Sequence, residues 1–384
     1  MLQDSGDRAG EAASRASAIA VIVGTRPETI KLVPLIHALV RCGLRPLVVN
    51  SGQHPTAVNR SLDEFGLRAD LTLPAVHGAP NLVAAVRCLQ RNLGAALLPR
   101  RPRLVVVQGD TSTAYAGARA GDALGCCVAH VEAGLRTASA AEPFPEEWFR
   151  RRITAYADLH FVPTAAARDN LLAEGVGPAA IHLSGNTGID SLRAALKERG
   201  PAPGGGRGDP HRVVVTLHRR ENWDENADLV CDALRDLSAA RPDLTFLLPV
   251  HPNPRIARRI ARKLGDHPRF SLVEPMRYRE FVGQASGAAL IVSDSGGIQE
   301  EAPHLGVPLL VPRSCTERPE ALATGFVRLV DVSRESIVRA ALDLLAQPRR
   351  DPVPFGPQAP FGDGFAAQRI VEVIGALAAE PLAA

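Results

Sequence analysis

The feature that most constrains the fold of this chain is a regular alternation of short apolar runs and amphipathic segments. Apolar, β-branched runs bounded by turn residues predict buried strands, and the spacing between them leaves room for helices. Such an alternation is typical of βαβ units and predicts parallel sheets. The runs that we interpret as strands are 18–25, 45–50, 103–110, 126–132, 159–164, 213–218, 244–251, 270–275, 288–294 and 308–312.

The chain of 384 residues is too long for one ordinary core, and its alternation pauses near Gly185. It restarts after a stretch rich in proline and glycine at 200–208, which predicts a surface loop. We therefore expect two doubly wound α/β domains, at 18–186 and 187–365. The polar segment 1–17 lacks the apolar core of a signal peptide, so we expect a disordered N-terminal extension.

Composition narrows the class of protein. Hydrophobic residues make up 46% and charged residues 22%, and a formal net charge of +3 does not indicate a nucleic-acid partner. No apolar run reaches the length of a membrane span, so we expect no membrane partner. The 6 cysteines lack metal-ligand spacing, which favours a reducing cytoplasmic setting and no metal site.

Polar and charged residues recur at one kind of position, directly after the apolar runs. In open α/β sheets, ligands bind beyond the carboxyl ends of the strands, so these residues gather at one edge. Because the pattern occurs in both halves, we predict two such edges that face each other across a small-molecule cleft. The residues are Arg26, Gln53, His54, Asp110, Glu132, His218, Arg219, Asn222, His251 and Ser295–Gly297.

Ser295–Gly297 lies between an apolar run and an amphipathic one, and we expect a sharp turn and a helix that starts near Ile298. A helix N-terminus with bare N–H groups and little side-chain bulk binds anions, typically phosphate. We expect Glu300 and Glu301 in the first helical turn, where one of them would reach a neutral polyol such as a ribose. The alternative is a glycine turn with acidic helix capping.

Permanent cations at the same edges suit a diphosphate, and surface salt bridges are the alternative for each of them. Arg26 is the strongest candidate, because it lies in a Gly-Thr-Arg-Pro turn that directs it to the ligand edge. The full set is Arg26, Lys31, Arg219 and Arg220.

Three carboxylates, Asp110, Glu132 and Glu146, follow strand ends or stand on a proline-stiffened loop. Carboxylates gathered in a dry cleft raise each other's pKa, which lets one serve as acid and another as base near neutral pH. Helix capping is the alternative for Glu146. His218 is a candidate acid/base group or phosphate donor, with a structural histidine as the alternative.

The motifs together resemble one family, the non-hydrolysing UDP-N-acetylglucosamine 2-epimerases, over roughly residues 18–378. They occur in the family's order, and no single motif carries the resemblance. The motifs are GTRPETIKLVPLI, SGQH, VQGDTST, HVEAGLRT, PFPEEWFRR, GNTGIDSL, TLHRREN, PVHPNP, SDSGGIQEEAPHLGVPLLVPR, TERPEAL and FGDG.

The resemblance implies a GT-B fold of two Rossmann-like domains, with a last helix at 366–382 that crosses back onto the first domain. It implies interconversion of UDP-GlcNAc and UDP-ManNAc by anti elimination of UDP, through 2-acetamidoglucal, and re-addition. It also implies that no nicotinamide or metal cofactor is needed, and that the protein is a homodimer.

Residue roles carry over where the motifs match. Ser295, Gly296 and Gly297 correspond to the phosphate-binding turn, and Glu301 to the glutamate that holds the ribose. Phe281 matches an aromatic residue beside the uracil. Asp110, Glu132 and Glu146, with His218, are implied to act in catalysis, and Arg26 lies near the diphosphate. Further substrate contacts are implied for Lys31, Arg136, Arg219, Asn222 and Arg318.

Some positions depart from the family pattern. Gln53, His54, Arg219 and His251 match a second UDP-GlcNAc site that activates bacterial members, but Pro55-Thr56 and His77 do not fit it. We therefore expect weakened or absent activation by substrate. Trp148-Phe149 and Thr154-Ala155 also replace the usual residues, which is compatible with a role in aminosugar or antibiotic biosynthesis.

Three other functions remain open at this point. One is a hydrolysing relative that releases ManNAc, although Glu132 and the PFPEE motif argue against it. Another is a GT-B glycosyltransferase, which would need an acceptor site. The third is a sugar-nucleotide-binding regulator that has lost catalysis.

Overall fold

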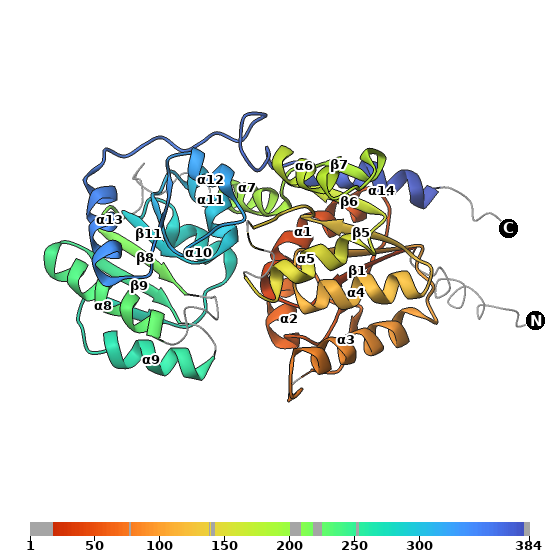
Figure 1. Ribbon diagram of the computed structural model, residues 1–384, viewed down its shortest axis with the longest axis horizontal. Coiled ribbons are helices and arrows are strands. Elements are labelled where there is room, and N and C mark those ends of the chain that lie inside the picture. Colours follow the sequence, from red (N-terminus) through yellow and green to blue (C-terminus); the bar gives the residue numbers. More distant parts are fainter. Residues whose placement is uncertain are drawn as a thin grey trace, which may run out of the picture.

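The protein forms two lobes that lie side by side, each built around a parallel sheet (Figure 1). The computed structural model describes residues 18–76, 78–137, 139, 143–199, 209–217, 225–250 and 253–379. We call the part around the seven-stranded sheet the first lobe and the part around the six-stranded sheet the second lobe. The segments 1–17 and 201–208 lie outside the described residues.

The first sheet has the order β3-β2-β1-β4-β5-β6-β7, and every neighbouring pair is parallel. Its central strands β1 and β4 are buried along their whole length, as expected for strands with helices on both faces. The strands are β1 (Ile19–Val23), β2 (Leu47–Asn50), β3 (Leu71–Thr72), β4 (Leu104–Gln108), β5 (Cys127–Val131), β6 (Leu159–Val162) and β7 (Ile181–Leu183).

The helices that flank this sheet begin at predictable caps. Thr25, Asn81, Thr111 and Thr164 each accept a hydrogen bond from a backbone N–H of the first turn, as N-cap residues do. The helices are α1 (Arg26–Arg41), α2 (Pro55–Glu64), α3 (Leu82–Leu97), α4 (Ser112–Ala123), α5 (Glu146–Thr154) and α6 (Ala165–Ala173), with a short 3₁₀ turn at Pro178–Ala180.

The second sheet repeats the plan with the order β10-β9-β8-β11-β12-β13, again all parallel. Its strands are β8 (Arg212–Thr216), β9 (Thr245–Pro249), β10 (Phe270–Val273), β11 (Leu290–Ser293), β12 (Leu309–Pro312) and β13 (Val327–Val330). Its helices are α8 (Glu225–Ala240), α9 (Pro254–Leu264), α10 (Tyr278–Ala285), α11 (Gly296–Leu305), α12 (Pro319–Ala323) and α13 (Arg334–Ala346).

Two helices join the lobes. α7 (Thr187–Arg199) follows β7 and contacts α1 of the first lobe as well as α10 and α11 of the second. α14 (Ala366–Ala379) comes after the second sheet in sequence, yet its Ile370 and Ile374 are fully buried in the core that contains β1 and α1. The domain division that we propose between residues 186 and 187 falls between β7 and α7.

All ten predicted strands are confirmed, and the structure adds β3, β7 and β13. These three lie at the sheet edges and are short or half-exposed, so their sequences lack a long apolar run. No helix among the described residues combines the length and apolar character needed to cross a bilayer.

Both sheets reverse their direction of winding at one point, between β1 and β4 in the first and between β8 and β11 in the second. At such a point the loops after the two central strands diverge and leave a crevice for ligands. Asp110 follows β4 and Ser295 follows β11, so both candidate site residues lie at these points.

Candidate functional site

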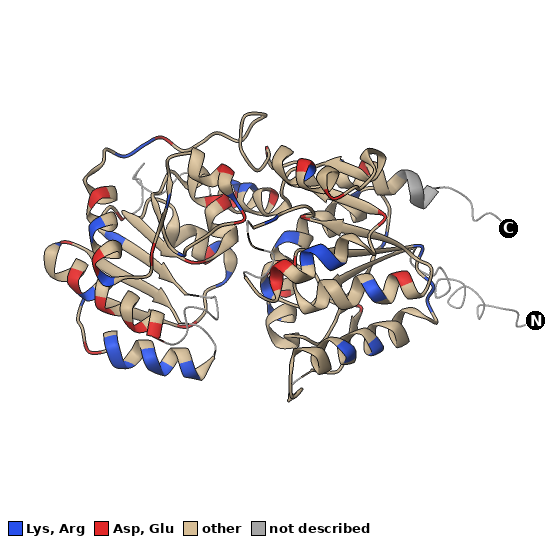
Figure 2. Ribbon diagram, viewed as in Figure 1, with Lys and Arg blue, Asp and Glu red and all other residues tan. Residues whose placement is uncertain are grey.

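A buried cluster of ion pairs joins the two lobes where their ligand edges meet. Lys31 on α1 donates to both oxygens of Glu132 at 2.6 and 2.7 Å, and its Nζ lies 3.7 Å from Glu300 on α11. Arg318, which precedes α12, donates to Glu132 across the lobes at 2.8 Å. Figure 2 shows acidic and basic segments of α5, α11 and α12 in this central region.

Glu132 lies directly after β5 with a backbone φ of 66°, a left-handed conformation that is uncommon for a residue with a side chain. Such a conformation persists only where the surroundings enforce it, and it is concentrated at functional sites. Here Lys31, Arg318 and the amide of Gln108 all donate to the Glu132 carboxylate. The carboxylate is therefore held in one orientation between the lobes.

Arg318 contacts three carboxylates of the cluster. Its guanidinium contacts Glu300, Glu317 and Glu132, and the residue is buried. Burial alone would lower the pKa of Arg318, but the three carboxylates outweigh burial and raise it. Arg318 is thus a permanent cation beside the start of α11, where an anionic ligand would compete with these carboxylates.

A second series of contacts brings Asp110 to the same cluster. Arg150 on α5 lies 2.6 Å from Asp110 and 3.5 Å from Glu317, which in turn contacts Arg318. Two of the three predicted catalytic carboxylates, Asp110 and Glu132, are therefore connected through alternating cations and anions. This alternation allows several charges to share a site with little exposure to water.

The turn predicted to bind phosphate is formed by Ser295, Gly296 and Gly297, but the helix starts earlier than expected. α11 begins at Gly296 with Ser295 as its N-cap, not near Ile298. Gly296 and Gly297 themselves adopt helical geometry, so the predicted helix start was two residues too late. A Cβ on Gly296 would lie less than 3.0 Å from the Arg318 guanidinium, whereas one on Gly297 would meet only Ser295 Oγ at 4.0 Å.

The same shift corrects the position of two glutamates. Glu300 and Glu301 lie in the second turn of α11, not the first, and both are buried. Glu300 accepts from Asn186 at 2.9 Å and from Arg318. Glu301 accepts from the hydroxyl of Tyr278 at 2.9 Å, and burial, partly offset by that hydrogen bond, raises the pKa of Glu301 to about 7.

Two more predicted contacts lie near Glu301. Arg26 is the first residue of α1, and Glu64 and Glu301 both act on its charge, although burial is the larger influence and lowers its pKa. Phe281 lies one turn after Tyr278 on α10 and packs in the core of the second lobe. Arg26 and Glu301 thus come from opposite lobes and interact electrostatically.

Arg136 and Glu146 have different surroundings. The Arg136 guanidinium donates to both oxygens of Glu174, at 2.8 and 2.7 Å, and to Thr154 Oγ1 at 3.0 Å. Glu146 opens α5 and is half-buried. These contacts of Arg136 lie within the first lobe, so its substrate role stays a prediction, as does that of Glu146.

Sequence reasoning assigned no role to several residues of this site. Arg150 and Glu317 lie inside the motifs PFPEEWFRR and TERPEAL. Their charge within a recognised motif could have indicated a place in the site. Glu28 accepts from Thr111 at 2.6 Å and from the Gly24 N–H at 3.1 Å, and burial raises its pKa to about 7. Tyr278 and Gln108 carried no such signal.

The residues expected to form a second site are only partly described. Gln53 accepts from the backbone N–H and the hydroxyl of Thr113, at 3.0 and 2.7 Å, and His54 is the N-cap residue of α2. The other predicted residues of this site and of the main site that lie outside the described residues are His218, Arg219, Arg220, Asn222 and His251, together with His77.

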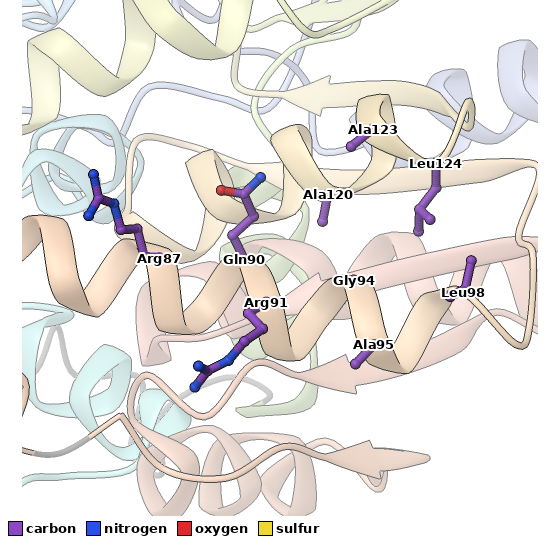
Figure 3. A pocket seen from close by; sticks show the side chains of 9 residues that line it. All are labelled: Arg87, Gln90, Arg91, Gly94, Ala95, Leu98, Ala120, Ala123 and Leu124. Atoms are coloured by element: carbon purple, nitrogen blue, oxygen red, sulfur yellow. The ribbon is translucent and has the colours of Figure 1, made fainter.

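A separate groove of about 420 Å³ lies between α3 and α4 of the first lobe (Figure 3). Its polar lining comes from Arg87, Gln90 and Arg91, and it contains no carboxylate. None of its lining residues belongs to the ion-pair cluster. Among the described residues, no group of three or more His, Cys, Asp or Glu side chains converges on a metal position.

Comparisons with known proteins agree on one family. The family model described as UDP-N-acetylglucosamine 2-epimerase matches residues 39–375. The protein of that name from Bacillus subtilis is 36% identical over 92% of this chain and 94% of its own length. The Escherichia coli K12 protein of that name is also 36% identical, over 93% and 98%.

Solved structures give the same result. The Neisseria meningitidis UDP-GlcNAc 2-epimerase bound to UDP-GlcNAc matches with a TM-score of 0.84 and 32% identity, over 93% of this chain and 99% of that one. The Methanocaldococcus jannaschii UDP-GlcNAc 2-epimerase in complex with UDP-GlcNAc and UDP matches with a TM-score of 0.83, also at 32% identity and with the same coverage.

Proposed function

The chain belongs to the UDP-N-acetylglucosamine 2-epimerase family, and from this premise we propose that it interconverts UDP-GlcNAc and UDP-ManNAc without hydrolysis. Family membership confirms the resemblance seen in the motifs, and the solved relatives confirm the GT-B fold class. The observation that carries the proposal is the cluster of Lys31, Glu132, Glu300 and Arg318, which places cations and carboxylates from both lobes at one point.

The chemistry requires a good leaving group, because the hydrogen on C2 is not acidic enough for simple deprotonation. In our proposal, the start of α11 and the cations Arg26, Lys31 and Arg318 bind the diphosphate and stabilise its charge as the C1–O bond breaks. UDP leaves with the electron pair of that bond. The unsaturated sugar that remains is 2-acetamidoglucal.

The carboxylates supply the proton transfers. A carboxylate takes the C2 proton from the face opposite the departing UDP, and the C–H electrons form the C1–C2 double bond. An acid on the other face then protonates C2, and UDP adds back at C1. Asp110 and Glu132, with Glu146 and His218, are the groups that we propose for these steps.

The proposal is tested by proton NMR of the protein with UDP-GlcNAc in deuterated buffer. We expect signals of UDP-ManNAc, loss of the C2 proton signal through exchange with solvent, and no free sugar. Free ManNAc with UDP would indicate the hydrolysing reaction instead. An unchanged spectrum would exclude both reactions and leave a binding protein or an acceptor-dependent glycosyltransferase.

We also propose that activation by UDP-GlcNAc is weak or absent. Pro55 and Thr56 form the first turn of α2, beside Gln53 and His54, where the family pattern has a second glutamine. Hyperbolic kinetics with UDP-ManNAc alone, unchanged by traces of UDP-GlcNAc, would support this. An absolute requirement for UDP-GlcNAc would contradict it.

Family membership further supports a homodimer, which light scattering at several concentrations would test. A mass twice that of the chain is the expected result.

A further inference from the structure

The N-terminus of α10 has an unusual cap. The first N–H groups of a helix have no partner inside the helix and need an external acceptor. The N-cap residue of α10 is Arg277, which makes no side-chain cap hydrogen bond. Instead Glu64, the last residue of α2, accepts from the N–H of Tyr278 at 3.0 Å and from the N–H of Arg279 at 2.9 Å.

This cap crosses from one lobe to the other. Glu64 belongs to a helix beside the first sheet, and Tyr278 lies 214 residues further along the chain, on a helix of the second lobe. The carboxylate uses one oxygen for each N–H, so both oxygens are engaged. A negative charge at a helix N-terminus also interacts favourably with the helix dipole.

The capped residue is the one that orients Glu301. The Tyr278 side chain is buried and its hydroxyl donates to Glu301 Oε1 at 2.9 Å. Glu64 therefore fixes the backbone of Tyr278, and Tyr278 fixes one oxygen of Glu301. This leaves the rest of that carboxylate oriented for a ligand.

Neighbouring contacts hold the same junction. The ring of Phe65, which follows Glu64, lies 6.2 Å from the ring of Tyr278, and the guanidinium of Arg279 lies 5.2 Å from the Phe65 ring. Arg279 also pairs with Glu198 on α7 at 3.0 Å. Burial lowers the pKa of Arg26, and the charges of Glu64 and Glu301 partly offset this effect.

We propose that Glu64 is a positioning residue for nucleotide recognition: it caps α10 across the lobes and thereby holds Tyr278 against Glu301, which accepts the vicinal hydroxyls of a ribose. The inference rests on the proposed function for the identity of the ligand. Because donor and acceptor belong to different lobes, this cap forms only when the lobes approach as in this structure. Ribose recognition is thereby coupled to the approach of the lobes.

The test compares UDP with 2′,3′-dideoxy-UDP, which keeps the base and the diphosphate but lacks both ribose hydroxyls. Calorimetric titration would measure both dissociation constants for the wild type, Glu64→Ala and Glu64→Gln. Asp63→Asn is the matched control, since it removes the same charge from the adjacent exposed position on α2.

We expect Glu64→Ala to weaken UDP binding about tenfold, which corresponds to the free energy usually lost with a helix cap. Binding of dideoxy-UDP should weaken less than about twofold. Glu64→Gln, which keeps one acceptor oxygen, should fall between. In turnover, KM should rise while kcat stays within about threefold. Asp63→Asn should resemble the wild type.

A second variant keeps the test decisive if Glu64→Ala folds poorly. Tyr278→Phe keeps the capped backbone N–H but removes the hydroxyl, so it should cause the same UDP-specific loss. The double variant Tyr278→Phe with Glu64→Gln should lose less UDP binding free energy than the sum of the two single variants, because both changes act through one hydrogen bond to Glu301.

Equal weakening of UDP and dideoxy-UDP binding, or unchanged UDP binding in Glu64→Ala, would overturn the inference and leave the proposed function intact. Additive losses in the double variant would also overturn it. A wild-type protein that binds neither nucleotide would overturn the proposed function, and the inference with it.

Discussion

The two lobes share one topology but present different chemistry at the edge where they meet. In the first lobe, Asp110 and Glu132 follow the ends of β4 and β5, which are buried along all or nearly all of their length. In the second lobe, Ser295–Gly297, Glu301 and Arg318 come from the start of a helix, its second turn and a loop. The proposed proton-transfer groups Asp110 and Glu132 thus follow strands of the first lobe, whereas the second lobe supplies the helix start and the buried carboxylate that we propose for the phosphate and the ribose.

This division makes a kinetic prediction: changes at Asp110 and Glu132 should lower kcat, and changes at the start of α11 and at Glu301 should weaken nucleotide binding. Arg318 is the exception, because it contacts Glu132 of the first lobe and Glu300 and Glu317 of the second.

Glu132→Gln should give the largest effect, a fall in kcat of about a thousandfold, because it removes a proton-transfer group. UDP binding should change by less than about fivefold. Steady-state kinetics and calorimetry would separate the two quantities, with Asp169→Asn as an exposed control of the same charge change. A large loss of UDP affinity with normal kcat would break the proposed division between the lobes.

Gly296→Ala should act mainly on nucleotide binding. The added methyl would lie within 3.0 Å of the Arg318 guanidinium, so the turn or the arginine must shift. Overpacking of this kind should weaken UDP binding about thirtyfold. Gly297→Ala, with only Ser295 Oγ near its new Cβ at 4.0 Å, should weaken it less than fivefold. Equal losses in the two variants would contradict this account of Gly296.

The pH dependence of UDP binding should report the titration of Glu301 in the second lobe. Burial raises the pKa of Glu301 to about 7, so the group gains a proton as pH falls from 8 to 6. A protonated carboxyl accepts hydrogen bonds from ribose hydroxyls less well than a carboxylate does. UDP affinity should therefore fall about five- to tenfold between pH 8 and pH 6. Dideoxy-UDP, which carries the same diphosphate, should not show this additional fall.

The smallest effect concerns stability without ligand. Burial raises the pKa of Glu28 in the first lobe and of Glu301 in the second to about 7, above the ordinary 4.5. The folded protein therefore holds these protons more tightly than the unfolded chain. The destabilising contribution of each group is absent below pH 4.5 and complete above pH 7.

The melting temperature should consequently fall between pH 5.5 and pH 8, by about 3 °C for each group. Glu28→Gln and Glu301→Gln should each flatten this dependence in a calorimetric scan. If the lobes unfold in separate transitions, each variant should flatten only the transition of its own lobe. A pH dependence that neither variant changes would contradict the assignment.

Much of the fold followed from local patterns, and much of the site did not. Ten strands were predictable because each depends on residues close together in sequence. The contact of Arg318 with Glu132 joins positions 186 residues apart, and that of Glu64 with Tyr278 joins positions 214 apart. No local pattern encodes such pairs, since they depend on how two separately folded sheets meet.

The short edge strands and the start of α11 were missed for a related reason. β3, β7 and β13 derive their conformation from a neighbouring strand more than from their own residues. The two glycines before Ile298 were interpreted as a turn, but both already belong to α11, which begins at Gly296. Local propensity was overruled in both cases by the surrounding structure.

The position of α14 has a consequence for how the chain acquires its structure during synthesis. Ile370 and Ile374 complete a core whose other members include Ile19 and Leu32, which leave the ribosome hundreds of residues earlier. Part of the apolar core of the nascent first lobe therefore stays uncovered until the second lobe and α14 have been synthesised. A truncation before residue 366 should expose that part of the core and make the protein a substrate for chaperones.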